Sequence, residues 1–352
     1  MKARIGQLGR PMNSVKFKIY KLYFTAPLHI SDEREDGSIS EKTVHSDTFY
    51  SALIACRAKV GMPIPEHGDL GCVISDLFPY YQLKENSNPV YFLPFPLQTT
   101  LPKLSDPADA KKVKSVRWVD ASLYSKLLQG KPAFEGKREE LNCIQGSYLS
   151  KSELPENSNG LKDFITSEIM QRVRIEDRTG KEPAIPYYVD RISFRDYSGL
   201  YFLVLGDTKM LDESLEILKM EGIGTDRNIG FGAFDYSIDS LTLELPEDAD
   251  HQVSLSMLIP ESKEQLSKLL ASIDVAYNFT RRGGWITTYP FTTLRKNAIY
   301  SFLPGSVFSL DKGLSCTIIG KIVNLKPDIG ELTPQYPIWR NGKSIMLPIK
   351  LQ

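Results

Sequence analysis

The stretch that decides the fold runs from Leu200 to Leu245 and reads LYFLVLGDTKMLDESLEILKMEGIGTDRNIGFGAFDYSIDSLTLEL. Its first six residues are all apolar or aromatic, which predicts a buried strand. Met210–Met220 predicts an amphipathic helix, and Phe234–Leu245 predicts a further strand. Between these last two lies the loop Gly222–Gly232, which contains four glycines. The order strand, helix, glycine-rich loop, strand is typical of an α+β unit.

The residues before this stretch continue the α+β pattern. Val15–Phe24 alternates apolar and polar residues and predicts a half-buried strand. Ser46 or Asp47 is expected to cap a helix that ends before Gly61, because apolar side chains recur at helical spacing after them. Residues 169–199 contain two β-like runs around a Gly-Lys-Glu-Pro turn and predict a long, partly exposed hairpin.

A second half of similar composition follows. Val253–Ile259 predicts a strand and Glu261–Ala271 a helix, and later strands are expected near 291–302, 307–310 and 316–323. Two β-α-β-rich halves favour an α+β fold built from two ferredoxin-like (RRM-like) domains. The expected division is an N-terminal extension (1–14), a first domain (15–245) with an insertion at about 100–160 and the hairpin at about 169–199, and a second domain (250–352).

Composition narrows the classes of function. The 352 residues carry 43 basic and 43 acidic side chains, so only local basic patches can attract a polyanion. The four cysteines are far apart and form no CxxC pair, which argues against disulfides and zinc sites. No apolar run of transmembrane length and no secretory segment occur. We therefore expect a cytoplasmic protein with no membrane association and no cofactor.

The loop Gly222–Gly232 favours contact with a polyanion. Its glycines permit positive φ angles, and successive amides in such a loop can form a nest for phosphate oxygens. Arg227 adds a charge-assisted contact. The loop is not a P-loop, because no Gly-Lys-Ser/Thr and no helix follow it. It is not a Rossmann fingerprint either, since Arg227 stands where the third glycine belongs. A plain helix-to-strand turn with Gly222 as C-cap is the alternative.

Several motifs, in order along the chain, resemble one family. The loop Gly222–Gly232 resembles the C-terminal glycine-rich loop of the RAMP proteins of CRISPR systems. His45–Leu53 (HSDTFYSAL), Arg174–Gly180 (RIEDRTG), Arg282–Ile286 (RGGWI) and Pro304–Phe308 (PGSVF) resemble segments of the fourth Csm subunit of type III-A effectors, in the Cas-five-like branch. The resemblance covers residues 15 to about 310. Residues 1–14, 325–352 and most of 100–160 match nothing in the family pattern.

The resemblance implies a non-catalytic subunit with two RAMP domains that binds the 5′ handle of a guide RNA (crRNA) for antiviral interference. It also implies that the hairpin acts as a thumb on the guide–target duplex. The implied protein partners are the large Palm-domain Csm subunit and the adjacent backbone RAMP subunit. A bent, single-stranded handle is held through its backbone and splayed bases. The expected RNA-binding residues are Gly222, Gly224, Arg227, Asn228, Gly230 and Gly232 in the loop, Arg172, Arg174, Arg178 and Arg191 in the hairpin, and His45, Arg281, Arg282 and Trp285.

Two other functions remain open from the residues. The first is a metal-independent endoribonuclease that processes guide precursors, with His29 as general base and Tyr23 or Lys21 as partner. The second is a structural adaptor that contacts only protein. A metal site is not expected, because His45 and Asp47 lack a third ligand at diagnostic spacing, and Asp47 is expected to be a helix cap.

Overall fold

The computed structural model describes residues 14–31, 39–99, 115–132, 142–144, 147–150, 164–174, 185–310 and 315–351. Three sequence predictions lie wholly or largely outside these ranges. They are the N-terminal extension, most of the 100–160 insertion, and the tip of the hairpin with Arg178.

A large, mainly antiparallel sheet organises the first two thirds of the chain. Its order in the described residues is β11-β1-β10-β3-β4-β5-β7-β6, with β2 also paired to β10 and only β5–β7 parallel. The longest strands of this sheet lie at one edge, where β1 (Ser14–Phe24) pairs along its whole length with β11 (Phe234–Glu244). The others are β2 (Cys72–Ile74), β3 (Phe78–Tyr81), β4 (Val90–Pro94), β5 (Trp118–Asp120), β6 (Asn142–Ile144), β7 (Tyr148–Ser150) and β10 (Gly199–Gly206).

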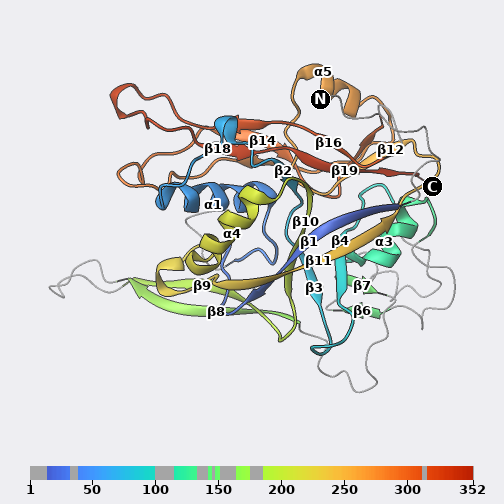
Figure 1. Ribbon diagram of the computed structural model, residues 1–352, viewed down its shortest axis with the longest axis horizontal. Helices are drawn as coiled ribbons and strands as arrows, with labels where there is room; N and C mark the ends of the chain where they lie inside the picture. The colour runs from blue at the N-terminus through green and yellow to red at the C-terminus, as the bar shows by residue number, and fades with distance from the viewer. Residues whose placement is uncertain are drawn as a thin grey trace.

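Two helices cover one face of this sheet. α1 (Ser46–Lys59) and α4 (Lys209–Glu221) lie side by side against it (Figure 1). Tyr20 and Leu22 of β1 point into the core beneath them, together with Leu53 of α1 and Leu215 of α4. The alternation in β1 places Phe17 and Ile19 on the opposite face. The sheet therefore needs a second layer on that side.

The C-terminal residues supply this second layer. A four-stranded sheet of order β15-β12-β19-β16 packs its apolar side chains, such as Val253 and Leu347, into the core formed by Phe17 and Ile19. The two halves of the chain thus share one apolar core. The strands are β12 (His251–Ser254), β15 (Val307–Ser309), β16 (Thr317–Ile319) and β19 (Ser344–Ile349), with the short helices α3 (Ala121–Leu128) and α5 (Lys263–Leu269) beside them.

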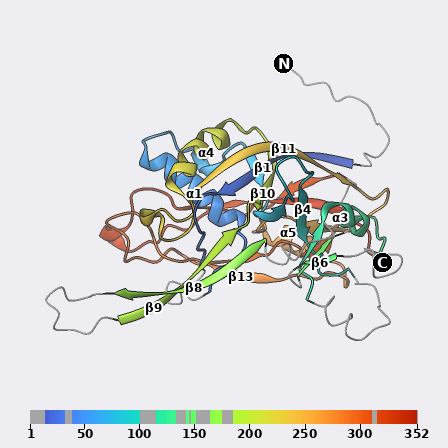
Figure 2. The ribbon, with the colours of Figure 1, turned by 90° about the horizontal axis from the view of Figure 1, so that it is seen from below.

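Three two-stranded sheets complete the described fold. The hairpin of β8 (Ile165–Arg174) and β9 (Ile185–Phe194) extends away from the body, as Figures 1 and 2 show. β13 (Phe279–Arg282) pairs with β14 (Ile299–Phe302), and β17 (Ile322–Asn324) pairs with β18 (Trp339–Asn341). None of the described helices is long and apolar enough to span a membrane.

The structure confirms a mixed α/β fold with antiparallel sheets and few helices. The ferredoxin-like identity of its halves stays a prediction. Three details were wrong. The N-cap of α1 is His45, and neither Ser46 nor Asp47 caps it, because both lie in its first turn. Residues 291–298 are turns and loops outside β14, and the strand expected at 253–259 is only β12.

Candidate nucleic-acid interface

The glycine-rich loop begins where α4 ends. Gly222 is the C-cap of the helix with φ +81°, so the C-cap prediction is confirmed. Gly224 and Gly232 also have positive φ, and a Cβ at Gly224 would lie 2.3 Å from the carbonyl oxygen of His29. Gly230 has φ +92° with open space around it. Glycine is therefore required here for close backbone packing as well as for turning the chain.

Hydrogen bonds fix the loop to the segment that follows β1. The Gly232 amide donates to the Pro27 carbonyl at 2.8 Å, and the Thr225 amide donates to the His29 carbonyl at 3.0 Å. Within the loop, Ile223 donates to the carbonyl of Gly232 at 3.0 Å. These amides already have partners, so they are not available to a phosphate. The amides of Gly222, Ile229, Gly230 and Phe231 also donate to backbone carbonyls, so a nest for phosphate oxygens would have to use the other amides of the loop.

The hairpin reaches the loop through one arginine. Arg172 of β8 forms an ion pair with Asp226, and its guanidinium lies 5.2 Å from the centre of the Phe231 ring. Asp226 has φ +61°, a left-handed conformation that places it at the start of the short helix η3 (Arg227–Ile229). The two elements that the sequence assigned to one RNA site are therefore in contact.

Arg227 and Asn228 lie in the first turn of η3. The Arg227 guanidinium is 3.2 Å from Glu221 at the end of α4, and its side chain is 29% exposed. Because Glu221 also pairs with Lys59 of α1, the carboxylate is shared between two cations. Arg227 is thus held in position yet still reaches solvent.

The other described candidate arginines of the hairpin, and the aromatic side chains beside them, lie in different environments. Arg191 pairs with Glu168 across the strands at 2.6 Å, and Arg174 lies on the exposed outer part of β8. Tyr187 and Tyr188 are 42% and 52% exposed, so their rings are accessible from solvent. Phe194 instead stacks on Phe24 at 4.9 Å in the protein.

The RGGW segment divides into buried and exposed residues. Arg282 is 7% exposed and donates to both carboxylate oxygens of Asp47, at 2.8 and 3.0 Å. Arg340 of β18 donates to the same carboxylate. Arg281 faces solvent on β13, and Trp285 lies under the Arg295 guanidinium at 4.8 Å. Arg282 is therefore placed to join α1 to the C-terminal strands.

Asp47 is held as an anion by these arginines. Burial alone would raise the pKa of this carboxyl, but the guanidinium groups of Arg340 and Arg282 hold the pKa far below its ordinary value. The beginning of α1 carries a second pair, in which His45 Nδ1 lies 2.6 Å from the buried carboxylate of Asp76. Burial lowers the pKa of His45, yet the Asp76 carboxylate outweighs it and the net shift is upward. His45 thus helps to fix the helix start.

His29 does not form the predicted catalytic group with its proposed partners. Its ring is 4% exposed, and Nδ1 lies 2.5 Å from the carbonyl oxygen of Asp190. Tyr23 bonds to Ser237, and Lys21 pairs with Asp239 at 3.9 Å, both on β11. No cluster of metal-ligating side chains occurs in the described ranges.

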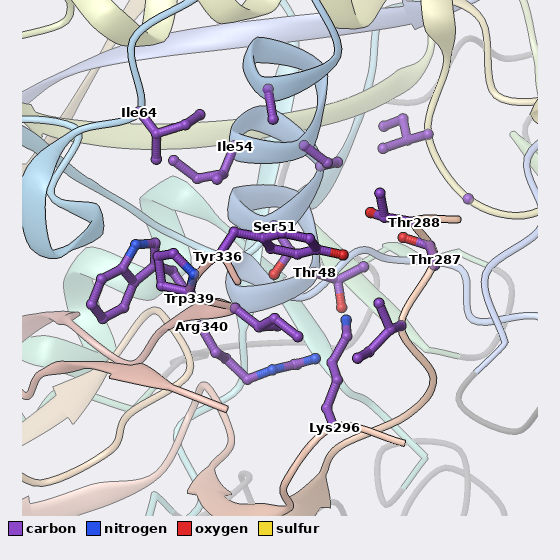
Figure 3. A pocket seen from close by; sticks show the side chains of 18 of the residues that line it. Thr48, Ser51, Ile54, Ile64, Thr287, Thr288, Lys296, Tyr336, Trp339 and Arg340 are labelled. Carbon is purple, nitrogen blue, oxygen red and sulfur yellow. The ribbon is translucent and has the colours of Figure 1, made fainter. Parts of the chain in front are cut away.

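A cavity of about 690 Å³ lies beside the glycine loop. Figure 3 shows α1 forming one wall, with Lys296, Tyr336 and Arg340 reaching in from the C-terminal residues. Gly224, Thr225 and Arg227 border the same space. The sequence did not predict this site. Tyr336, Trp339 and Arg340 lie in residues 325–352, where the sequence motifs indicated no site.

Lys296 is the unpaired cation of the cavity. In the described part of the chain its ammonium has no carboxylate within ion-pair distance, because Asp47 is taken by the two arginines. Burial, and then the Arg340 guanidinium, lower the pKa of Lys296 to about 8. The charged form of this lysine is therefore disfavoured in the folded protein.

This pKa predicts a pH-dependent stability. Between pH of about 8 and 10.4 the unfolded chain keeps the Lys296 proton that the folded chain has lost, so stability rises with pH. Between about pH 7 and pH 9.5, the free energy of unfolding of the wild type should rise by on the order of 1–2 kcal/mol relative to that of Lys296→Met. Urea unfolding at each pH measures this change. Lys263→Met, at the exposed start of α5, is the control and should follow the wild type. If the difference in free energy of unfolding between the wild type and Lys296→Met does not change with pH, the lowered pKa of Lys296 would be contradicted.

Known proteins match the chain along most of its length. Residues 247–349 match the family model described as the CRISPR Csm4 C-terminal domain. The prediction that residues 325–352 match nothing in the family was therefore wrong for all but the last three of them. The Csm4 protein of Mycobacterium tuberculosis (strain CDC 1551 / Oshkosh) is 28% identical over 286 residues, which cover 78% of this chain and 83% of that protein. The Csm4 protein of Streptococcus thermophilus is 27% identical over 320 residues, covering 88% and 93%.

Solved structures share the fold. The Csm3–Csm4 subcomplex of a type III-A CRISPR–Cas interference complex matches with a TM-score of 0.56 at 18% identity, over 95% of this chain and 99% of that chain. A Csm1–Csm4 cassette in complex with cA4 matches with a TM-score of 0.53 at 18% identity, over 96% and 99%.

These matches define a class of protein: the chain is similar to subunits of type III CRISPR–Cas effector complexes. Within that class it is similar to Csm4 proteins along most of its length, and residues 247–349 match the Csm4 C-terminal domain. The resemblance to the fourth Csm subunit, which the ordered motifs indicated, is confirmed.

Proposed function

We propose that this chain is a non-catalytic crRNA-binding subunit of a type III-A complex that holds the 5′ handle of the guide. One observation carries the proposal. Arg172 joins the hairpin to the glycine-rich loop through Asp226 and Phe231, so the two predicted RNA-binding elements are in direct contact. An arginine-bearing loop beside exposed aromatic side chains suits a single strand, whose phosphates and bases are both accessible.

Each element has a role in this proposal. Arg227 and the unoccupied loop amides bind phosphates of the handle. Tyr187 and Tyr188 stack on bases, each contact being worth roughly 1–3 kcal/mol. The hairpin acts as the thumb that interrupts guide–target pairing, because it extends from the body (Figure 2). Two RAMP domains of ferredoxin-like type provide the scaffold.

The protein partners follow from the relatives. Solved complexes of similar fold contain Csm4 with Csm1 and Csm4 with Csm3. We propose that this chain likewise docks a large Palm-domain subunit and an adjacent backbone RAMP subunit during antiviral interference. Copurification of the chain with such a large subunit and an RNA of guide length tests this assembly. Recovery of the chain with protein but without RNA would favour the adaptor alternative.

Arg227→Ala should weaken retention of the guide at least about fivefold, since it removes a charge-assisted phosphate contact. RNA cleavage chemistry in the assembled complex should stay unchanged. Filter binding of a labelled handle RNA to the purified complex measures the effect. Arg117→Ala, at an exposed arginine just before β5, is the control. Equal affinities of wild type and Arg227→Ala would count against the proposal.

The enzyme alternative has a separate test. It requires the purified chain to cleave a repeat RNA without metal, and His29→Ala to abolish that cleavage. The burial of His29 and its contact with the Asp190 carbonyl favour a packing role instead.

A further inference from the structure

We propose that the cavity beside the glycine loop binds one nucleotide, an unpaired base together with its phosphate. The phosphate lies at Lys296, and the base lies against the wall formed by α1. The cavity adjoins the glycine loop, but no residue of the hairpin lines it.

Charge is the first argument. Arg282, Arg340 and Lys296 bring three cations to one region at the junction of the two halves, where Asp47 is the buried carboxylate among them. Glu66 also lines the cavity, but its side chain is 90% exposed and lies 3.5 Å from His67. His45 does not change this balance, because its own partner is Asp76. A buried excess of positive charge is costly unless an anion compensates it. A phosphate at Lys296 would provide that compensation.

Unsatisfied polar atoms are the second argument. The Tyr336 hydroxyl is buried and has no hydrogen-bond partner among the described residues. Figure 3 shows its ring lying across α1, with Thr48 and Ser51 on the helix beside it. Buried hydroxyls are normally paired, so an orphan that borders a cavity indicates a ligand with a hydrogen-bonding group.

The shape and surface of the cavity are the third argument. A volume of about 690 Å³ lies within the range of small-molecule sites. Ile54, Ala55 and Ile64 give one wall an apolar surface, and the Trp339 ring lies beside them (Figure 3). A flat base suits such a wall, whereas a bare phosphate would leave it without contacts.

Position connects the cavity to the glycine loop. Gly224, Thr225 and Arg227 border it, so a nucleotide bound there lies next to the loop proposed to bind the guide backbone. A nucleotide of the guide handle is one source of the ligand, and that source rests on the proposed function. A free mononucleotide is the other source, and it presents the same chemistry.

The test uses the full chain with AMP and inorganic phosphate as probes, measured by titration calorimetry. AMP should bind the wild type more tightly than inorganic phosphate, because only AMP uses the apolar wall. Lys296→Ala should lower AMP affinity at least about tenfold, and Tyr336→Phe by about threefold. Ala55→Trp fills the cavity from α1 without changing charge and should abolish binding. Lys263→Ala is the matched control, and melting curves verify that each variant is folded.

A handle RNA measured with the same variants identifies the source. Loss of both AMP and RNA affinity in Lys296→Ala and Ala55→Trp would assign the site to a guide nucleotide, whereas loss of AMP affinity alone would assign it to a free nucleotide. No AMP binding by the wild type, or AMP binding that is unchanged in Lys296→Ala, would overturn the proposal. Absence of RNA binding by the wild type with Lys296-dependent AMP binding intact would instead overturn the proposed function alone.

Discussion

Replacing Asp47 by alanine should lower the free energy of unfolding by about 3–5 kcal/mol, because it leaves two buried arginines without their carboxylate. Asp47 is 1% exposed, and Arg282 and Arg340 are both almost fully buried around it. These side chains come from α1, β13 and β18, so the loss should also loosen the junction between the two halves of the chain. Urea unfolding followed by tryptophan fluorescence measures the effect, since Trp339 lies beside Arg340.

Two further variants test whether the loss of stability comes from the two arginines left without a carboxylate. Asp248→Ala breaks an exposed ion pair with Lys350 and should change stability by less than about 1 kcal/mol. The triple variant Asp47→Leu, Arg282→Met, Arg340→Met removes every charge of the cluster and should recover much of the stability lost in Asp47→Ala. A cost below about 1 kcal/mol for Asp47→Ala would show that the arginines find other partners, which contradicts the expected role of the carboxylate.

Local sequence patterns predicted the helices and strands whose apolar spacing is contained within the element itself. β1, α4, β10 and β11 were placed to within about two residues, since alternation and helical spacing decide burial along a single element. The hairpin β8–β9 was also predicted, because two β-rich runs flank a turn. The C-cap at Gly222 followed from the same local chemistry.

Features that depend on distant partners were missed. β19 is fully buried between β12 and β16, yet its short run SIMLPI contains a proline and showed no sign of such a central place. Asp47 was assigned to a helix cap because the sequence cannot show that Arg282 and Arg340 meet it from 235 and 293 residues away. The cavity could not be predicted for the same reason, since its walls come from segments that are far apart in the chain.

The conformation of the glycine loop predicts a sharp contrast between two of its glycines. Gly232→Ala should lower the free energy of unfolding by at least about 2–3 kcal/mol, whereas Gly230→Ala should cost about 1 kcal/mol. Both residues have positive φ, so both substitutions carry the same kind of backbone strain. A Cβ at Gly230 meets nothing within 4 Å, but at Gly232 it would lie 1.8 Å from the carbonyl oxygen of Ile223.

Relief of that clash must shift the backbone and break two hydrogen bonds, from Ile223 to Gly232 and from Gly232 to Pro27. The first closes the loop on itself, and the second ties it to the segment after β1. Gly232→Ala should therefore speed amide exchange at Ile223 and Gly232 and weaken handle RNA binding, whereas Gly230→Ala should do neither to a comparable extent. If the two substitutions lower the free energy of unfolding equally, the positive φ angle alone would account for the loss. The rigid attachment of the loop would then not be what presents Arg227 to the guide.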